Sequence, residues 1–247
     1  MKIRKIKDIR YLEEKTDNYL GDFDGIIGNI YKKTSDTIYI GKRIARKLNE
    51  LEFELGENDH LYINLSNKLK EAKIKEQDKF LDSRIKCYDY GINPSVFNSM
   101  TDNEKDKKIN EITFEVLYWV CNKEKLNINH VINTEKLIEK FDTNLIINYK
   151  TKETNNYRIK LNFQIRPNGK KSKLIIEYLN KKENSLQQKK MNIFDYEDLY
   201  SLIDKVSVKD SFINLHSKKS YHSELVKKKY NNFPTIIEIN KMEIINT

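Results

Sequence analysis

The chain has few of the residues that make flexible connections and disulfide frameworks. Among its 247 residues are only 7 glycines, 3 prolines and 2 cysteines. So few glycines and prolines leave no flexible linker and little glycine-dependent loop chemistry. The two cysteines, Cys87 and Cys121, do not suggest a disulfide framework, so we predict that both are reduced and buried.

Long apolar stretches are also missing. No stretch approaches the roughly 18 to 20 apolar residues that a membrane span needs. The first residues, Met1–Asp8, are basic and lack the apolar core of a secretory signal. We therefore expect a cytoplasmic protein that makes no contact with a membrane.

The signatures of common catalytic sites are absent as well. The chain has no glycine-rich phosphate loop, no Gly-x-Ser-x-Gly elbow and no kinase signature. Its histidines, His60, His130, His216 and His222, do not have the spacing of a structural zinc motif. We therefore expect no catalytic residue, no metal and no cofactor, and a protein that is not an enzyme.

The net charge is +9, and almost all of the excess is lysine, because the chain has 46 basic residues of which only seven are arginine. A basic chain suggests a nucleic-acid partner. Arginine is the usual residue for reading base edges, however, and the abundance of Ile, Asn, Tyr and Lys is typical of AT-rich codons. We assign the larger share of the basicity to codon bias and keep a Lys-rich nucleic-acid-binding protein as the alternative.

Two acidic patterns are candidates for cation sites. Asp22 and Asp24 in the segment Gly21–Gly25 have the spacing of two ligands of a hard cation, but the other oxygen ligands of a calcium loop are missing. A solvated turn is the better interpretation. Asp59 followed by Glu71-Ala72-Lys73 has the loose spacing of a metal-dependent nuclease, in which carboxylates bind Mg²⁺. Glu-x-Lys arises easily by chance in such a chain, so a nuclease is the less favoured alternative.

Hydrophobic periodicity predicts an α+β protein. In the first half we predict strands at Thr37–Ile40, 61–65 and 85–90, a helix over 42–55 and a polar surface excursion over 68–79. The main helix is predicted at about 102–121. It begins with the capping box Thr101-Asp102-Asn103-Glu104, and Ile109, Ile112, Val116 and Val120 make its apolar face, which we expect to pack on an antiparallel sheet.

In the second half the apolar period changes from 3.6 to 2. A further helix is expected over about 130–141, with Leu137, Ile138 and Phe141 facing inward. An antiparallel meander follows at about 144–194, and alternation is strongest over 157–165. A short helix over 195–203 and strands over 206–208, 212–215 and 235–239 complete the chain. We predict one α+β domain over 1–247, with a possible weak subdivision near 142.

One part of the chain resembles a known class of proteins. The segments Asp59–Leu65, Tyr88–Pro94, Phe97–Asp102 and Ile112–Leu117 are similar in layout to bacterial immunity proteins, which neutralise the toxin domains of contact-dependent and polymorphic toxin systems. The resemblance covers about residues 59–120. It implies a protein that binds its cognate toxin stoichiometrically and has no catalytic residues. Immunity proteins against nuclease toxins are typically acidic, so the basic charge is a departure from that class.

An acidic stretch beside these segments is the predicted binding surface. Such a stretch suits the cationic cleft of a toxin that acts on polyanions. Our first hypothesis is therefore a toxin inhibitor that occludes its partner through this stretch. Its members are Glu50, Glu52, Glu54, Glu57 and Asp59.

Overall fold

The computed structural model describes residues 3–14, 25–26, 28, 30–78, 82–230 and 233–245. The chain divides into two compact units, Met1–Leu145 and Ile146–Thr247, which are described separately below. The division lies close to the position near 142 where the sequence allows a subdivision. The single domain stays a prediction, whereas the α+β class is confirmed, because both helices and sheets are abundant.

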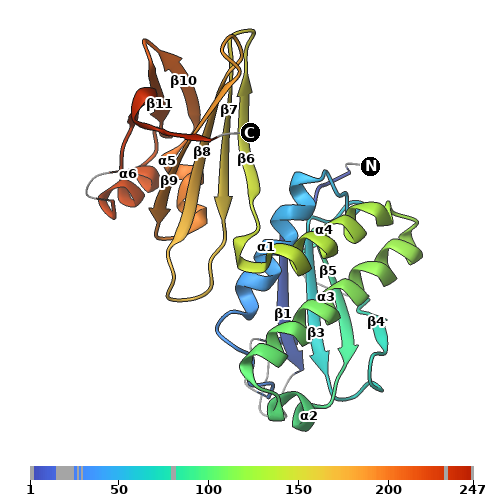
Figure 1. Ribbon diagram of the computed structural model, residues 1–247. Coiled ribbons are helices and arrows are strands. Elements are labelled where there is room, and N and C mark those ends of the chain that lie inside the picture. The colour runs from blue at the N-terminus through green and yellow to red at the C-terminus, as the bar shows by residue number, and fades with distance from the viewer. Residues whose placement is uncertain are drawn as a thin grey trace. The chain divides into compact units, whose positions relative to one another are not determined.

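The first unit is built on a five-stranded sheet with the order β2-β1-β3-β5-β4 (Figure 1). Its three central strands, β1 (Asp8–Glu14), β3 (His60–Ser66) and β5 (Ile85–Gly91), are parallel. The outer strands, β2 (Gly25–Ile26) and β4 (Ile74–Glu76), pair antiparallel with β1 and β5. The strands expected at 61–65 and 85–90 are thus confirmed, and the polar excursion over 68–79 contains the short strand β4.

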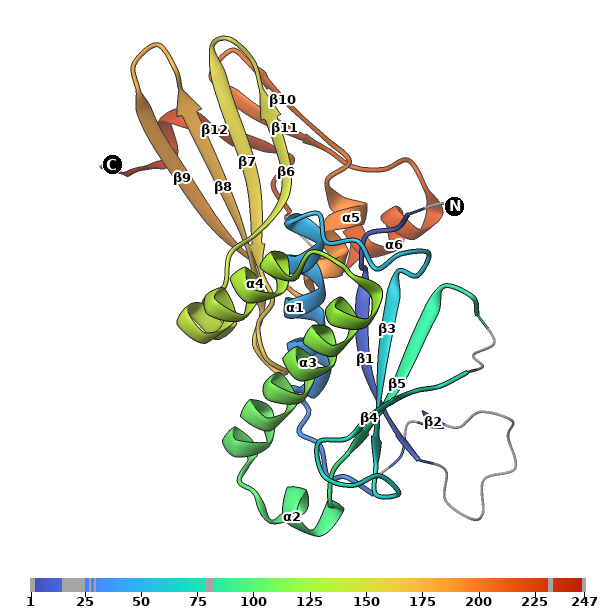
Figure 2. The same ribbon diagram turned by 90° about the vertical axis from the view of Figure 1, so that its right-hand side faces the viewer.

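Two helices, α1 (Thr37–Glu50) and α3 (Asp102–Glu124), lie on one face of this sheet, and α4 (Ile128–Phe141) packs against both of them (Figure 2). The Tyr11 hydroxyl on β1 shares a buried 2.7 Å hydrogen bond with Thr113 Oγ1 on α3. The predicted apolar face of α3 is fully buried, and its capping box is present. The prediction that α3 packs on an antiparallel sheet is wrong. The chain passes from β1 through α1 to β3, and this crossover makes the two strands parallel.

The expected strand at Thr37–Ile40 is wrong, because these residues form the first turn of α1. Their strand propensity is overridden by packing against β1. A Cβ on Gly41 would lie 2.5 Å from the carbonyl oxygen of Ile9, so only glycine lets the helix approach the strand this closely. The helix also ends at Glu50, earlier than expected.

Two other features of this unit differ from expectation. Phe141, expected to face inward, is exposed, whereas Ile138 on the same helix is buried. The short helix α2 (Pro94–Ser99) was not predicted; the Asn93 side chain caps it by accepting from the Ser95 amide. Both cysteines are free and buried, as predicted.

The second unit contains the predicted antiparallel meander. Strands β6 (Ile147–Glu153), β7 (Tyr157–Gln164), β8 (Ser172–Asn180) and β9 (Ser185–Ile193) pair in sequence order, and β13 (Glu243–Ile245) adds to β9. Alternation of apolar and polar residues predicts these strands correctly because one face of the sheet is largely buried and consecutive strands are neighbours.

The segment η2 (Tyr196–Asp198) and the helix α5 (Leu199–Leu202) follow this sheet. The rings of Phe163 and Tyr196 stack at 5.4 Å, and the Tyr149 hydroxyl donates to the Ile203 carbonyl at 2.7 Å, which holds this segment on the sheet. A second sheet has the order β10 (Lys205–Lys209), β11 (Phe212–His216), β12 (Ile236–Glu238).

Helix α6 (Tyr221–Lys228) lies between β11 and β12 in the sequence and was not predicted. The Ser220 side chain caps it by accepting from the Ser223 amide at 3.2 Å. It contacts α5, and Figure 1 shows the two helices beside each other. Within the described part of the chain, no helix is long and apolar enough to cross a membrane.

Candidate nucleic-acid interface

Two members of the predicted acidic binding surface are engaged by lysines. Glu50, at the end of α1, forms a 2.8 Å ion pair with Lys47. Glu52 forms an ion pair with Lys5, and it adopts a positive φ of 64° in the turn after α1. Both ion pairs lower the negative charge that this stretch presents to a partner.

The other three members differ in exposure. Glu54 and Glu57 are exposed in the connection between α1 and β3, whereas Asp59 is 1% exposed. A partner that contacts this stretch would therefore meet Glu52, Glu54 and Glu57, while Asp59 is reached only through its neighbours. The role of all five residues as a binding surface stays a prediction.

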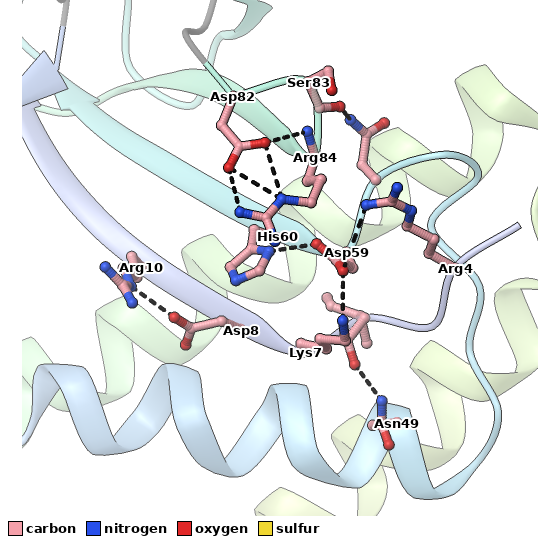
Figure 3. A network of polar contacts seen from close by, with 12 residues as sticks. Arg4, Lys7, Asp8, Arg10, Asn49, Asp59, His60, Asp82, Ser83 and Arg84 are labelled. Atoms are coloured by element: carbon pink, nitrogen blue, oxygen red, sulfur yellow. Dashed lines mark hydrogen bonds and ion pairs between the residues drawn. The ribbon is translucent and has the colours of Figure 1, made fainter. Parts of the chain in front are cut away.

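Asp59 is the centre of a polar network at the amino end of β3 (Figure 3). Its carboxylate forms a 2.7 Å ion pair with Lys7 Nζ and a 2.5 Å contact with His60 Nδ1, and the Arg4 guanidinium lies 3.9 Å away. Burial alone would raise the pKa of Asp59, but the hydrogen bonds from Lys7 and His60 outweigh it and hold the pKa below its usual value. The network links the residues before β1 to the start of β3, which is a structural role.

The residues suggested for a nuclease site are far apart. Asp59 precedes the first residue of β3, whereas Glu71 accepts a 3.2 Å hydrogen bond from the Asn93 amide, beyond the carboxyl end of β5. Since β3 and β5 pair over seven residues at about 3.3 Å each, the two carboxylates lie ~20 Å apart. They cannot share one metal ion. Asp22 and Asp24 lie outside the described residues.

The charge of the protein is divided unequally between its two units. Met1–Leu145 contains 26 of the 46 basic and 26 of the 37 acidic residues, so it is neutral, whereas Ile146–Thr247 contains 20 basic and 11 acidic residues and carries the whole +9. Lysine is abundant in both, with 21 in the first and 18 in the second. Codon bias explains lysine in both units but not the scarcity of carboxylates in one of them.

Lysines of the second unit gather around α6. They occupy the end of α6 and its C-cap, the loop before the helix and the position just before β8, and we call them the α6 surface: Lys171, Lys218, Lys219, Lys227, Lys228 and Lys229. Among these, Lys229 forms a 3.4 Å ion pair with Asp198; within the described residues the other five form none. The lysines at the end of α6 also suit the negative end of its dipole, but those at 171, 218 and 219 have no such explanation.

An aromatic pocket lies on one side of this surface. It has a volume of about 300 Å³ and contains the rings of Phe194, Tyr230 and Phe233 between Lys171 and Lys229. The ring centroids of Phe194 and Tyr230 are 5.0 Å apart, and those of Tyr230 and Phe233 are 5.7 Å apart. Aromatic rings flanked by lysines are the usual composition of a surface that binds single-stranded nucleic acid.

The pocket is held in place by a buried carboxylate. The Tyr230 hydroxyl donates to Asp198 Oδ2 at 2.7 Å and accepts from the backbone amide of Phe194 at 2.9 Å. Burial, and then the hydrogen bond to Asp198, raise the pKa of Tyr230 above its ordinary value, so its hydroxyl keeps its proton at physiological pH. These bonds hold the Tyr230 side chain and the Phe194 backbone in place.

A second depression lies along α6 and the loop before it. Its volume is about 840 Å³, and it includes His216, Lys218, Lys219, Tyr221 and Lys227. His216 Nε2 and Ser207 Oγ are 2.9 Å apart, which connects β11 to β10. Lysines therefore line both concave surfaces, an arrangement that can bind an extended polyanion.

This surface was not predicted from the sequence. The runs Lys218-Lys219 and Lys227-Lys228-Lys229 were a usable signal, but the aromatic residues are scattered in the sequence and converge only through folding. No family model, no curated protein and no solved structure matches the chain. Among the described residues, no group of three or more His, Cys, Asp or Glu side chains is placed to hold a metal ion.

Proposed function

We propose that this protein binds nucleic acid through the α6 surface of its second unit. The observation that carries the proposal is the segregation of charge, since the whole +9 belongs to Ile146–Thr247. Lysines act as point charges toward phosphates, and an interface with few arginines has little means of reading base edges. The binding is therefore largely independent of sequence, and counterion release dominates its free energy.

The test is the salt dependence of binding of the full chain to a fluorescein-labelled 12-nucleotide strand, measured by anisotropy. The logarithm of the affinity should fall linearly with the logarithm of salt concentration, by about 0.7 for each phosphate neutralised. Replacing Lys218, Lys219 and Lys227 by Glu should weaken binding at least about tenfold and reduce the slope by about 2.

The matched control reverses three exposed lysines of the first unit, Lys73, Lys75 and Lys107. It changes the net charge by the same amount, so it separates a local surface from the overall charge. We expect a much smaller loss in the control. Equal losses in the two variants, or no binding by the unaltered protein, would remove the proposal.

A toxin inhibitor of the immunity type is our second proposal. Its support is the exposure of Glu52, Glu54 and Glu57 in the turn that joins α1 to β3 in the neutral unit. Reversing Glu52 and Glu54 to Lys should slow association with a cationic partner more than it speeds dissociation. A pull-down from the native cell that recovers a protein at one-to-one stoichiometry supports this proposal; recovery of nucleic acid alone, released by moderate salt, argues against it.

A further inference from the structure

Phe194 is placed unusually for an apolar side chain. It is 52% exposed and lies at the edge of the aromatic pocket, directly after β9. Its backbone amide is bound by the Tyr230 hydroxyl, and its ring contacts the Tyr230 ring, so it is not a loose surface residue. A single exposed apolar residue needs no explanation, but three aromatic rings around a concave surface do.

The Lys171 ammonium lies 5.0 Å from the centroid of the Phe194 ring. This cation–π contact places the ammonium over one face of the ring. Because the lysine stem is flexible, the ammonium can leave the ring for a phosphate and free that face for stacking.

The remaining lining combines two apolar residues, Met191 and Pro234, with the polar side chain of Asn192. Asn192 contributes an amide that has both donors and acceptors, which can meet the edge of any base. Lys229 places a second ammonium at the pocket, partly neutralised by Asp198. The volume of about 300 Å³ is at the lower end of the range for small-molecule sites, which fits one flat ring system.

We infer that this pocket receives one unpaired base of a single-stranded nucleic acid, stacked on Phe194, while Lys171 and Lys229 bind phosphates of the same strand. The inference rests on the proposed function and extends it. Charge alone would let the surface bind single strands and duplexes alike, whereas the pocket gives it a preference for single strands. Paired bases in a duplex cannot enter the pocket without being unstacked.

The experiment compares the full-length protein with two variants, Phe194→Ala and Phe212→Ala, on the labelled 12-nucleotide strand and on a duplex of the same length. Phe212 is the matched control, since it is an exposed phenylalanine of the same unit, on β11 and outside the pocket. Phe194→Ala should weaken single-strand binding about 5- to 100-fold, the range of one lost stacking contact, with the salt slope unchanged. Phe212→Ala should bind as the unaltered protein does, and Phe194→Trp should retain the affinity.

Further results separate this inference from the proposed function. A strand of abasic sites should bind Phe194→Ala and the unaltered protein equally, because no base is left to stack. RNA and DNA strands should suffer the same loss, since stacking does not involve the 2′-hydroxyl. If the unaltered protein binds the strand with a steep salt dependence but Phe194→Ala binds equally well, the pocket inference is overturned and the proposed function stands. If the unaltered protein binds no nucleic acid, both fail.

Discussion

Tyr230 donates a 2.7 Å hydrogen bond to Asp198, and this bond joins the end of α6 to the segment that follows β9. Asp198 is 6% exposed and also receives the Lys229 ammonium. A buried carboxylate in a basic unit thus organises both the aromatic and the cationic side of the pocket. The interaction is local to the second unit, so it can be tested without reference to the first.

Removing the Tyr230 hydroxyl should loosen the pocket. In Tyr230→Phe, the exposed Phe194 amide and one oxygen of the buried Asp198 lose their partner, and leaving the buried oxygen unsatisfied costs about 1–3 kcal/mol. We expect a lower free energy of unfolding in urea and weaker binding to single strands. Tyr221→Phe is the control, because Tyr221 is 77% exposed and its hydroxyl should contribute little. Equal stability of the two variants would contradict the role assigned to Asp198.

The core of the first unit can be tested on α3. Val116 is fully buried, so Val116→Asp places an uncompensated charge in the core and should lower the free energy of unfolding by several kcal/mol. Lys107→Asp, at an exposed position of the same helix, should change it by no more than about 0.5 kcal/mol. If Val116→Asp had the thermal stability of the unaltered protein, the assignment of α3 to the core would be contradicted.

Local signals in the sequence predicted much of the fold. The alternation at 157–165 gives β7, and the capping box at Thr101 gives the start of α3, because each depends on neighbours in the chain. The strand predicted at Thr37–Ile40 is wrong for the opposite reason: the conformation of this segment depends on the contact between Gly41 and Ile9, more than thirty residues earlier. Strand direction in the first unit was missed because alternation is the same in parallel and antiparallel strands.

The candidate site could be predicted far less well. Phe194, Tyr230 and Phe233 have no common motif, and they meet only because α6 folds back beside the segment after β9. Charge segregation is present in the sequence, but it emerges only when the boundary at Leu145 is known. A total of +9 over the whole chain conceals a neutral unit and a strongly basic one.

Divalent metals should have no specific effect on the first unit. Asp59 and Glu71 lie at opposite ends of the parallel strands, so neither Mg²⁺, Mn²⁺ nor Zn²⁺ should raise the melting temperature or produce cleavage of a labelled oligonucleotide. The measurement is thermal unfolding with each metal or with EDTA, alongside a cleavage assay. A metal-dependent rise in melting temperature that is lost on changing Asp59 or Glu71 would revive the nuclease alternative.

The Asp59 network predicts a specific dependence of stability on pH. The pKa of Asp59 is lower in the folded protein than in the unfolded chain, so between these two pKa values the unfolded state binds more protons. The contribution of Asp59 is therefore complete above its unfolded pKa of about 3.9 and is lost as pH falls through the lower folded value. Asp59→Asn should cost about 1–3 kcal/mol at pH 7, because charged hydrogen bonds to Lys7 and His60 are lost. The difference between the variant and the unaltered protein should narrow below about pH 4.

Asp82 provides the matched comparison, since it also has a lowered pKa, caused by hydrogen bonds from Arg84 (Figure 3). Its 2.6 Å ion pair with Arg84 is at the surface, where water screens the charges, so Asp82→Asn should affect stability much less than Asp59→Asn. Urea unfolding of both variants between pH 3 and pH 7 makes the comparison. If Asp59→Asn were as stable as the unaltered protein at pH 7, the ion pair with Lys7 would not hold the residues before β1 against β3. In that case Asp59 would be available for another role at the amino end of this sheet.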